Sequence, residues 1–310
     1  MRVFVSYSHQ QGQWVWDRLV PVLKAGGAEV LIDKQHFTLG AAVVGQMDAL
    51  QAQAERHLLV FSPDYLASAY CQHEMKNALA LDPTFSQHLI VPIKREACSL
   101  PKSFLSKTPR PGKNPIYADL QDDSKEEVWD KLLQACEASG LGAKATDWLA
   151  ARDEIRKFLE RNQSVNLVVN GDGVNWRGLL DHLAADCFPD LARVDLQHPD
   201  TTSREGLLSA IAKAMGSKIK IPPKPHDLAE FNRLFNGRTT PVRLCLSHFD
   251  LAAYREYYDV DLFSSLRYLN METRQLVLLV QSKQAFGSLL PKDNPLSKLN
   301  FQTVEIWGKS

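Results

Sequence analysis

Short runs of β-branched and aromatic residues alternate with amphipathic stretches through the first 140 residues, and this alternation restricts the fold more than any other feature. Helical spacing of apolar residues predicts helices between the runs. Buried strands that alternate with helices form a doubly wound parallel sheet with right-handed crossovers. We therefore expect an α/β domain with a five-stranded parallel sheet, whose strands are predicted at residues 3–8, 29–33, 56–61, 88–93 and 114–117.

The chain has 310 residues, more than a single hydrophobic core usually holds, so two domains are expected. Small and flexible residues at 141–147 predict a linker. The predicted organisation is a first domain at 1–140, this linker, and a second α/β domain at 148–310. In the second domain, strands are predicted at 164–171, 240–250 and 274–281, and helices at 148–159, 179–185 and 262–269.

One predicted helix, at residues 68–79, carries the main catalytic candidate. Ser68 is a good N-cap, and no Gly or Pro follows within the helix. Glu74 lies at the edge of the apolar stripe and one turn after Tyr70. A half-desolvated carboxylate beside an aromatic ring suits a group that meets a substrate cation; the alternative is a Glu on a solvated helix flank. The stripe itself consists of Cys71, Met75, Ala78 and Leu79.

The predicted sheet also indicates where a ligand would bind. In open α/β sheets, ligands bind outside the carboxyl ends of the strands, where the winding reverses. Tyr7, Ser8 and the loop after Asp33 come directly after predicted strands, and the Glu74 helix follows another. The sequence therefore predicts that these residues share one edge of the sheet.

Residues 1–140 resemble a Toll/interleukin receptor (TIR) domain of the bacterial type. The resemblance depends on four segments that occur in order and at the family's spacing, none of which is diagnostic by itself. They are Phe4-Val-Ser-Tyr-Ser8, the loop from Asp33 through Phe37 to Gly40, Phe61-Ser-Pro-Asp-Tyr65, and Ser68-Ala-Tyr-Cys-Gln-His-Glu74. The resemblance implies a flavodoxin-like fold.

TIR domains include adaptors that only assemble and enzymes that cleave NAD+ at the nicotinamide–ribose bond. The enzymes carry a Glu four residues after an aromatic residue, at the position of Glu74; the aromatic residue is usually Trp, and here it is Tyr70. The resemblance implies that Tyr7 and Ser8 flank the nucleotide, that Asp33 belongs to the same site, and that Phe37 closes over it. The alternatives are a strand end that satisfies local backbone donors and a hydrophobic loop anchor. NAD+ would be the substrate, and no cofactor or metal is expected.

The second domain contains a strand, a Gly-containing loop and a helix, which is the setting of a phosphate-binding loop. Such a loop reads G-x-x-x-x-G-K-[ST], so that backbone amides approach the phosphates, the Lys balances charge and the hydroxyl holds magnesium. Counted from Gly171, with Gly173 in the loop, the last three places hold Trp176, Arg177 and Gly178. Arg177 retains a charge that could meet an anion, but we expect no working magnesium–nucleotide site.

A second nucleotide-type strand, at 240–250, ends in Ser247 and His248 instead of acidic residues, with Asp250 two places late. The order of elements resembles a degenerate STAND-type, P-loop NTPase-like regulatory domain without ATPase activity. The alternative is an α/β domain in which the loop glycines merely make a turn. Cys245 and His248 would point to opposite faces of a strand, so no zinc site is expected.

Composition excludes several classes of partner. Lys plus Arg equals Asp plus Glu at 36 each, so the overall charge calls for neither nucleic acid nor an anionic membrane. The first residues lack the apolar core of a signal peptide, and no run approaches the length of a membrane span. Five cysteines without a C-x-x-C pair fit reduced thiols. We expect a cytoplasmic protein.

These expectations lead to one main hypothesis and one rival. The first is an NAD+ glycohydrolase, with cyclisation of ADP-ribose as a further route, that works as a homo-oligomer of TIR domains. An activating partner protein or ligand would act on the C-terminal half, and analogy with bacterial TIR proteins implies anti-phage defence by NAD+ depletion. The rival is a non-catalytic TIR scaffold, either a signalling adaptor or an effector that interferes with host TIR pathways.

Overall fold

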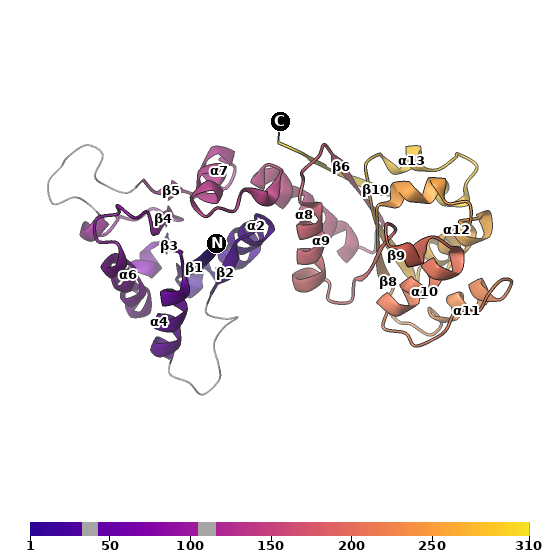
Figure 1. The fold of residues 1–310 in the computed structure, drawn as a ribbon, viewed down its shortest axis with the longest axis horizontal. Helices are drawn as coiled ribbons and strands as arrows, with labels where there is room; N and C mark the ends of the chain where they lie inside the picture. Colours follow the sequence, from indigo (N-terminus) through magenta and orange to yellow (C-terminus); the bar gives the residue numbers. More distant parts are fainter. Residues whose placement is uncertain (33–42, 105–115, 310) are drawn as a thin grey trace. The chain divides into compact units, whose positions relative to one another are not determined.

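The computed structural model describes residues 1–32, 43–104 and 116–309 (Figure 1). The chain divides into two compact units, Met1–Leu149 and Ala150–Ser310. Each unit contains its own five-stranded parallel sheet, which confirms the expectation of two α/β domains. Asp33 and Phe37 lie outside the described residues.

In the first unit the strand order is β2-β1-β3-β4-β5, the flavodoxin-like order, in which the winding reverses between β1 and β3. The predicted five-stranded sheet is therefore confirmed. Its fifth strand begins after the predicted range, because residues 116–117 form no regular structure and β5 starts at Ala118. The strands are β1 (Arg2–Tyr7), β2 (Glu29–Leu31), β3 (Arg56–Phe61), β4 (Ile90–Lys94) and β5 (Ala118–Asp119).

Local signals explain where the helices of this unit begin and end. Gly27 has a φ of +102°, which favours glycine, and it follows the end of α2. The hydroxyls of Ser62 and Ser68 accept hydrogen bonds from the amides of Tyr65 (3.1 Å) and Cys71 (3.3 Å), so each serine caps a helix. The helical segments are η1 (His9–Gln11), α1 (Gly12–Trp14), η2 (Val15–Leu19), α2 (Val20–Ala25), α4 (Val43–Gln53), α5 (Pro63–Ala67), α6 (Ala69–Leu81), η3 (Lys102–Phe104) and α7 (Glu126–Ala135).

The segment predicted as a linker, 141–147, is packed within the first unit. Leu141, Ala143 and Ala145 are buried. The carboxylate of Glu126 accepts hydrogen bonds from the backbone amides of Ala145 (2.9 Å) and Thr146 (3.0 Å). The short helix η4 (Ser139–Leu141) precedes it, and the division between the units falls inside α8 (Ala145–Glu160).

In the second unit the strand order is β10-β6-β9-β8-β7. The predicted strands at 164–171, 240–250 and 274–281 correspond to β6, β8 and β9. Strands β7 and β10, which form the two edges of the sheet, were not predicted. The strands are β6 (Val165–Asn170), β7 (Ala192–Asp195), β8 (Val242–Ser247), β9 (Leu276–Ser282) and β10 (Gln302–Trp307); the helical segments are α9 (Trp176–His182), η5 (Leu183–Cys187), η6 (Pro199–Thr201), α10 (Arg204–Ala214), α11 (Asp227–Arg233), η7 (Phe249–Tyr254), α12 (Val260–Arg267), η8 (Tyr268–Glu272), α13 (Phe286–Leu289) and η9 (Pro295–Lys298).

A buried ion network connects three segments of the second unit. Arg204 on α10 donates two hydrogen bonds to Asp227, whose side chain is fully buried, and two to Asp259. Lys224 also donates to Asp259, at 2.5 Å. Burial acts to raise the pKa of Asp259, but the hydrogen bonds from Lys224, the Leu262 amide and Arg204 lower it to about 2. The network therefore holds α10, α11 and the start of α12 together.

Candidate functional site

Glu74 lies on the buried face of α6. Its side chain is 7 % exposed, and it shares that face with Cys71, Met75 and Ala78. Leu79, which we predicted in the stripe, is only half buried. The carboxylate therefore lies within the apolar stripe and not at its edge, where we placed it, because a polar partner in the sheet accommodates it.

That partner is Ser6, the second-last residue of β1. The Ser6 hydroxyl donates a short hydrogen bond to Oε2 of Glu74. The same hydroxyl is 2.9 Å from the phenol oxygen of Tyr65, and Ser6 and Tyr65 are almost completely buried. Three residues from β1, α5 and α6 thus meet beside the reversal point between β1 and β3.

The number of protons on the Ser6 hydroxyl decides which residue donates in each hydrogen bond of this group. A serine hydroxyl has one proton, and Ser6 gives it to Glu74, so Tyr65 must be the donor to Ser6. Burial raises the pKa of Tyr65 well above its usual value, and the neighbouring Glu74 raises it further, whereas the bond to Ser6 opposes both. Tyr65 consequently remains a neutral phenol, and the chain of donors ends at the carboxylate.

The backbone of Glu74 is fixed from the other side. Gln51 on α4 donates a hydrogen bond of 2.7 Å from its amide nitrogen to the carbonyl oxygen of Glu74. Gln51 is buried. The carboxylate and the main chain of one residue are therefore positioned by two separate elements, β1 and α4.

The other residues that we predicted to contact the substrate have other partners or are exposed. Neighbouring side chains of a strand point to opposite faces, so the Tyr7 ring does not share the face of Ser6; its phenol oxygen accepts a hydrogen bond from Trp16 (3.1 Å). Ser8 caps η1 by accepting from the amide of Gln10, which is the alternative role considered above. Tyr70 is 58 % exposed, one turn before Glu74. Asp33 and Phe37 cannot be placed, since they are outside the described residues.

Ser6 and Tyr65 were not predicted to be partners of the carboxylate. Ser6 was detectable as a polar residue inside an otherwise apolar strand, with Val3, Phe4 and Val5 before it. Tyr65 belongs to the segment that follows β3. Their meeting with Glu74 depends on the order of strands, which periodicity alone does not give.

In the second unit, the loop between β6 and α9 contains two glycines in the left-handed region of backbone conformation. Gly171 and Gly173 adopt positive φ values of 88° and 82°. Arg177 is exposed, and its guanidinium lies 4.4 Å from the centre of the Trp176 ring and 3.2 Å from Nε2 of His248. Trp176 and His248 line the adjacent pocket, whereas Arg177 itself does not.

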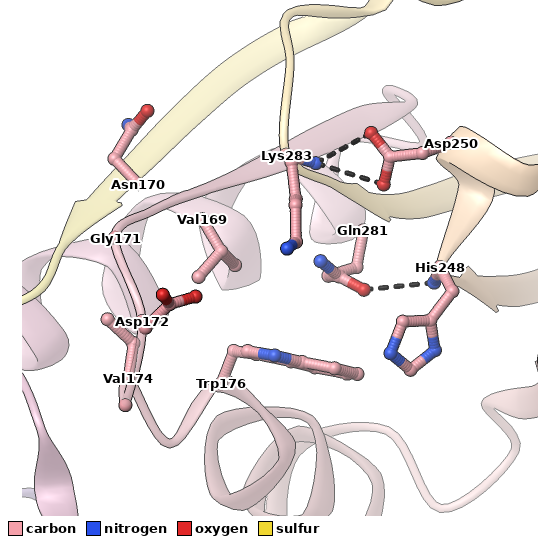
Figure 2. Close-up of a pocket in the computed structure, with 11 residues that line it drawn as sticks. Val169, Asn170, Gly171, Asp172, Val174, Trp176, His248, Asp250, Gln281 and Lys283 are labelled. Carbon is pink, nitrogen blue, oxygen red and sulfur yellow. Dashed lines mark hydrogen bonds between the residues drawn. The ribbon is translucent and has the colours of Figure 1, made fainter.

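The pocket lies at the carboxyl ends of β6, β8 and β9 and has a volume of about 350 Å³. Figure 2 shows the Trp176 ring on one side, with the side chains of Asp172, Gln281 and Lys283 directed toward the space beside it. The remaining lining residues are Val169, Asn170, Gly171, Gly173, Val174, His248 and Asp250.

Within 1–32, 43–104 and 116–309, no helix has both the length and the apolar character of a membrane span. In the same ranges no group of three or more His, Cys, Asp or Glu side chains is arranged to hold a metal ion.

Comparison with known proteins identifies the first unit. Residues 3–133 match the family model described as TIR domain. Over 72 residues the chain is 26 % identical to Toll-like receptor 1 and to Toll-like receptor 6 of Homo sapiens; the match covers 23 % of this chain and 9 % of each receptor. The chain is also similar to the crystal structure of the TIR domain of the Toll-related Receptor TRR-2 from Hydra magnipapillata. That match covers 43 % of this chain and 94 % of the chain in the crystal structure, with 22 % identity and a TM-score of 0.36.

Proposed function

Since residues 3–133 are a TIR domain, we propose that this protein is an NAD+ glycohydrolase in which Glu74 is the catalytic carboxylate. One observation supports the proposal most: the Glu74 side chain is 7 % exposed yet lies at the strand ends beside the reversal point of the sheet, where α/β proteins bind ligands. Taking a charged carboxylate out of water costs free energy even when it is hydrogen bonded, as Glu74 is to Ser6, so its position at the strand ends suits a functional role.

The chemistry needs one carboxylate and not two. The bond between C1′ of the ribose and the pyridinium nitrogen breaks with both electrons passing to nitrogen, so nicotinamide leaves as a neutral molecule. Positive charge develops on the ribose, and a negative carboxylate beside it stabilises that charge where it appears. Water then adds to C1′ and loses a proton, which yields ADP-ribose.

Ser6 and Tyr65 prepare the carboxylate for this role. The bond from Ser6 occupies Oε2 of Glu74 and fixes its orientation before the substrate arrives. Ser6 and Tyr65 are positioning residues in the proposal, since they act through Glu74. Tyr70, which is largely exposed on the same helix, is available as a ring surface for the nucleotide.

Assembly is the proposed control. TIR domains commonly self-associate, and we extend this to a homo-oligomer whose formation activates turnover. The second unit would respond to a partner protein or ligand and is proposed to be a degenerate P-loop-like domain without ATPase activity. The five cysteines, all in the described residues, form no disulfide, which suits a reducing cytoplasm. NAD+ depletion in an infected cell is the proposed outcome.

The direct test is nicotinamide release by the purified full-length protein, measured at rising protein concentration and with a crowding agent. Glu74→Gln keeps the size of the side chain and removes its charge, so we expect turnover to fall at least about a hundredfold. Circular dichroism and the oligomer distribution should stay unchanged. If the wild-type protein and the variant show the same negligible turnover in every assembled state, the chain is a scaffold.

A further inference from the structure

The pocket of the second unit is lined by two buried side chains whose hydrogen-bond donors have no acceptor among the described residues. Gln281 is 2 % exposed, and its amide oxygen accepts a hydrogen bond of 2.9 Å from the backbone of His248. Among the described residues, its amide nitrogen has no hydrogen-bond partner, and Figure 2 shows this nitrogen directed into the pocket. The nitrogen is open to the pocket, because the buried side-chain atoms without a partner among the described residues are Nδ1 of His57 and Oδ1 of Asn166. It is therefore a donor on a fixed, buried side chain that a bound acceptor can reach.

Two further donors, on Trp176 and Lys283, line the same pocket. The indole nitrogen of Trp176 is a donor in a side chain that is 9 % exposed, and it too has no acceptor among the residues that the structure describes. The side chain of Lys283 reaches into the same space, and its amine forms no ion pair within the described ranges (Figure 2). Three donors, one of them charged, therefore face one cavity, and a carboxylate is the acceptor that such a set recognises.

A negatively charged side chain lies across the cavity from Lys283. The carboxylate of Asp172 points into the pocket from the β6–α9 loop (Figure 2). Asp250 also lines the pocket, but its carboxylate accepts two hydrogen bonds from the backbone amide of Lys283 (2.9 and 3.1 Å). The cavity thus presents a cation on one side, an anion on the other, and the Trp176 ring beside both.

We propose that this pocket binds a small zwitterion of the amino-acid type. Its carboxylate would lie between Lys283 and Gln281, and its ammonium would face Asp172 beside the Trp176 ring. The volume of about 350 Å³ is in the range of small-molecule sites. A nucleotide triphosphate fits poorly, because two carboxylates and one lysine line the cavity and no hydroxyl stands where a phosphate loop would hold magnesium.

This site is independent of the proposed NAD+ chemistry, because all its residues belong to the second unit. It can therefore be tested without measuring turnover. The full-length protein is labelled with 5-fluorotryptophan and followed by ¹⁹F NMR, and a Trp176→Phe variant assigns the one signal among six tryptophans that reports on the pocket.

The probes are the common L-amino acids, added singly at concentrations up to tens of millimolar. For the one that binds most tightly, the matching amine and the matching carboxylic acid are then compared. We expect the amino acid to bind at least about tenfold more tightly than either fragment, since each lacks one charged contact.

The variants separate the two ends of the ligand. Lys283→Met should weaken the amino acid and the carboxylic acid, and Asp172→Asn should weaken the amino acid and the amine, each by about tenfold. Lys218→Met, an exposed lysine of the same unit outside the pocket, is the control and should change nothing. The proposal is overturned if no amino acid shifts the Trp176 signal, if a fragment binds as tightly as the amino acid, or if ATP binds the pocket more tightly than any of them.

Discussion

The two units of this protein use buried carboxylates in different ways. In the first unit, Glu74 meets the neutral hydroxyl of Ser6 near the strand ends. In the second unit, the buried Asp227 and the partly exposed Asp259 meet the guanidinium of Arg204 between helices. Both units have a five-stranded parallel sheet, so the sheet does not decide how an acidic residue is used.

The two kinds of partner suit the carboxylates to different roles. An ion pair with a bidentate arginine satisfies most of the lone pairs of a carboxylate and neutralises its charge, which suits a structural role. A hydrogen bond from a hydroxyl fixes the orientation and leaves the negative charge in place, which suits a group that must stabilise a positive transition state. The partner of a buried acid is therefore a better indication of its role than its burial.

The strongest effect is expected from Arg204→Met. This change leaves Asp227 as a buried charge without its cation, so the second unit should lose about 3–5 kcal/mol of stability. Hydrogen exchange measured by mass spectrometry on the whole chain should show the loss in α10, α11 and α12, while β1 and α6 keep their protection. Arg193→Met removes a surface pair with Asp181 and is the control, with an expected cost below about 1 kcal/mol. Equal loss in both units would contradict this account of the network.

Low pH should reduce the stability of the second unit because Asp259 becomes protonated. Its pKa is lowered to about 2 in the folded state, from an ordinary value of 3.8. A lowered pKa contributes stability that is complete above the unfolded value and disappears as the pH falls through the folded value. We expect the second unit to lose stability as the pH falls from about 4 to about 2. Urea denaturation across that range, compared with Asp259→Asn, measures this; a variant with the same acid dependence as the wild type would exclude Asp259 as the cause.

A smaller effect is expected from Ser6→Ala on the proposed NAD+ turnover. Loss of the hydroxyl leaves Glu74 charged but less well oriented, so kcat should fall about tenfold with KM nearly unchanged. Steady-state kinetics on the assembled protein separates the two constants. A rise in KM alone would show that Ser6 contacts the substrate, and an unchanged kcat would show that the orientation of Glu74 is fixed by other groups.

Tyr65→Phe should have the smallest effect of these four changes. It removes the donor to Ser6 and keeps the ring that packs on Phe61, at a ring-centre distance of 5.1 Å. We expect the first unit to lose about 1 kcal/mol of stability, because one buried hydrogen bond is lost. Chemical denaturation measures this, and kcat should fall less than in Ser6→Ala. A larger loss of kcat than in Ser6→Ala would mean that the phenol acts directly.

The sequence predicts most of the framework because local signals and tertiary packing agree. Strands β1, β3 and β4 are apolar runs, and α6 has a serine cap and a regular stripe. The edge strands of the second unit were missed for different reasons. Strand β7 has four residues, two of them charged, which is too short for a period to appear. In strand β10, apolar and polar residues alternate, with Val304 and Ile306 buried between exposed neighbours. This pattern could have predicted a strand.

The candidate site was harder to predict than the framework. The spacing of Tyr70 and Glu74 suggested a shared site, whereas the residues that hold the carboxylate are far from it in sequence. Contacts of this kind depend on strand order and on the face to which each side chain points, and neither is encoded locally. The pocket of the second unit is a similar case, because Gln281 was only part of a predicted apolar strand.

The bond between Gln51 and the carbonyl of Glu74 has a mechanical consequence. A side-chain amide spans the gap from α4 to α6 at the residue proposed to act on the ribose. When α4 slides or tilts by more than such a bond tolerates, either the bond breaks or the backbone of Glu74 moves with it. While the bond holds, a displacement of α4 therefore shifts the backbone that carries the Glu74 carboxylate.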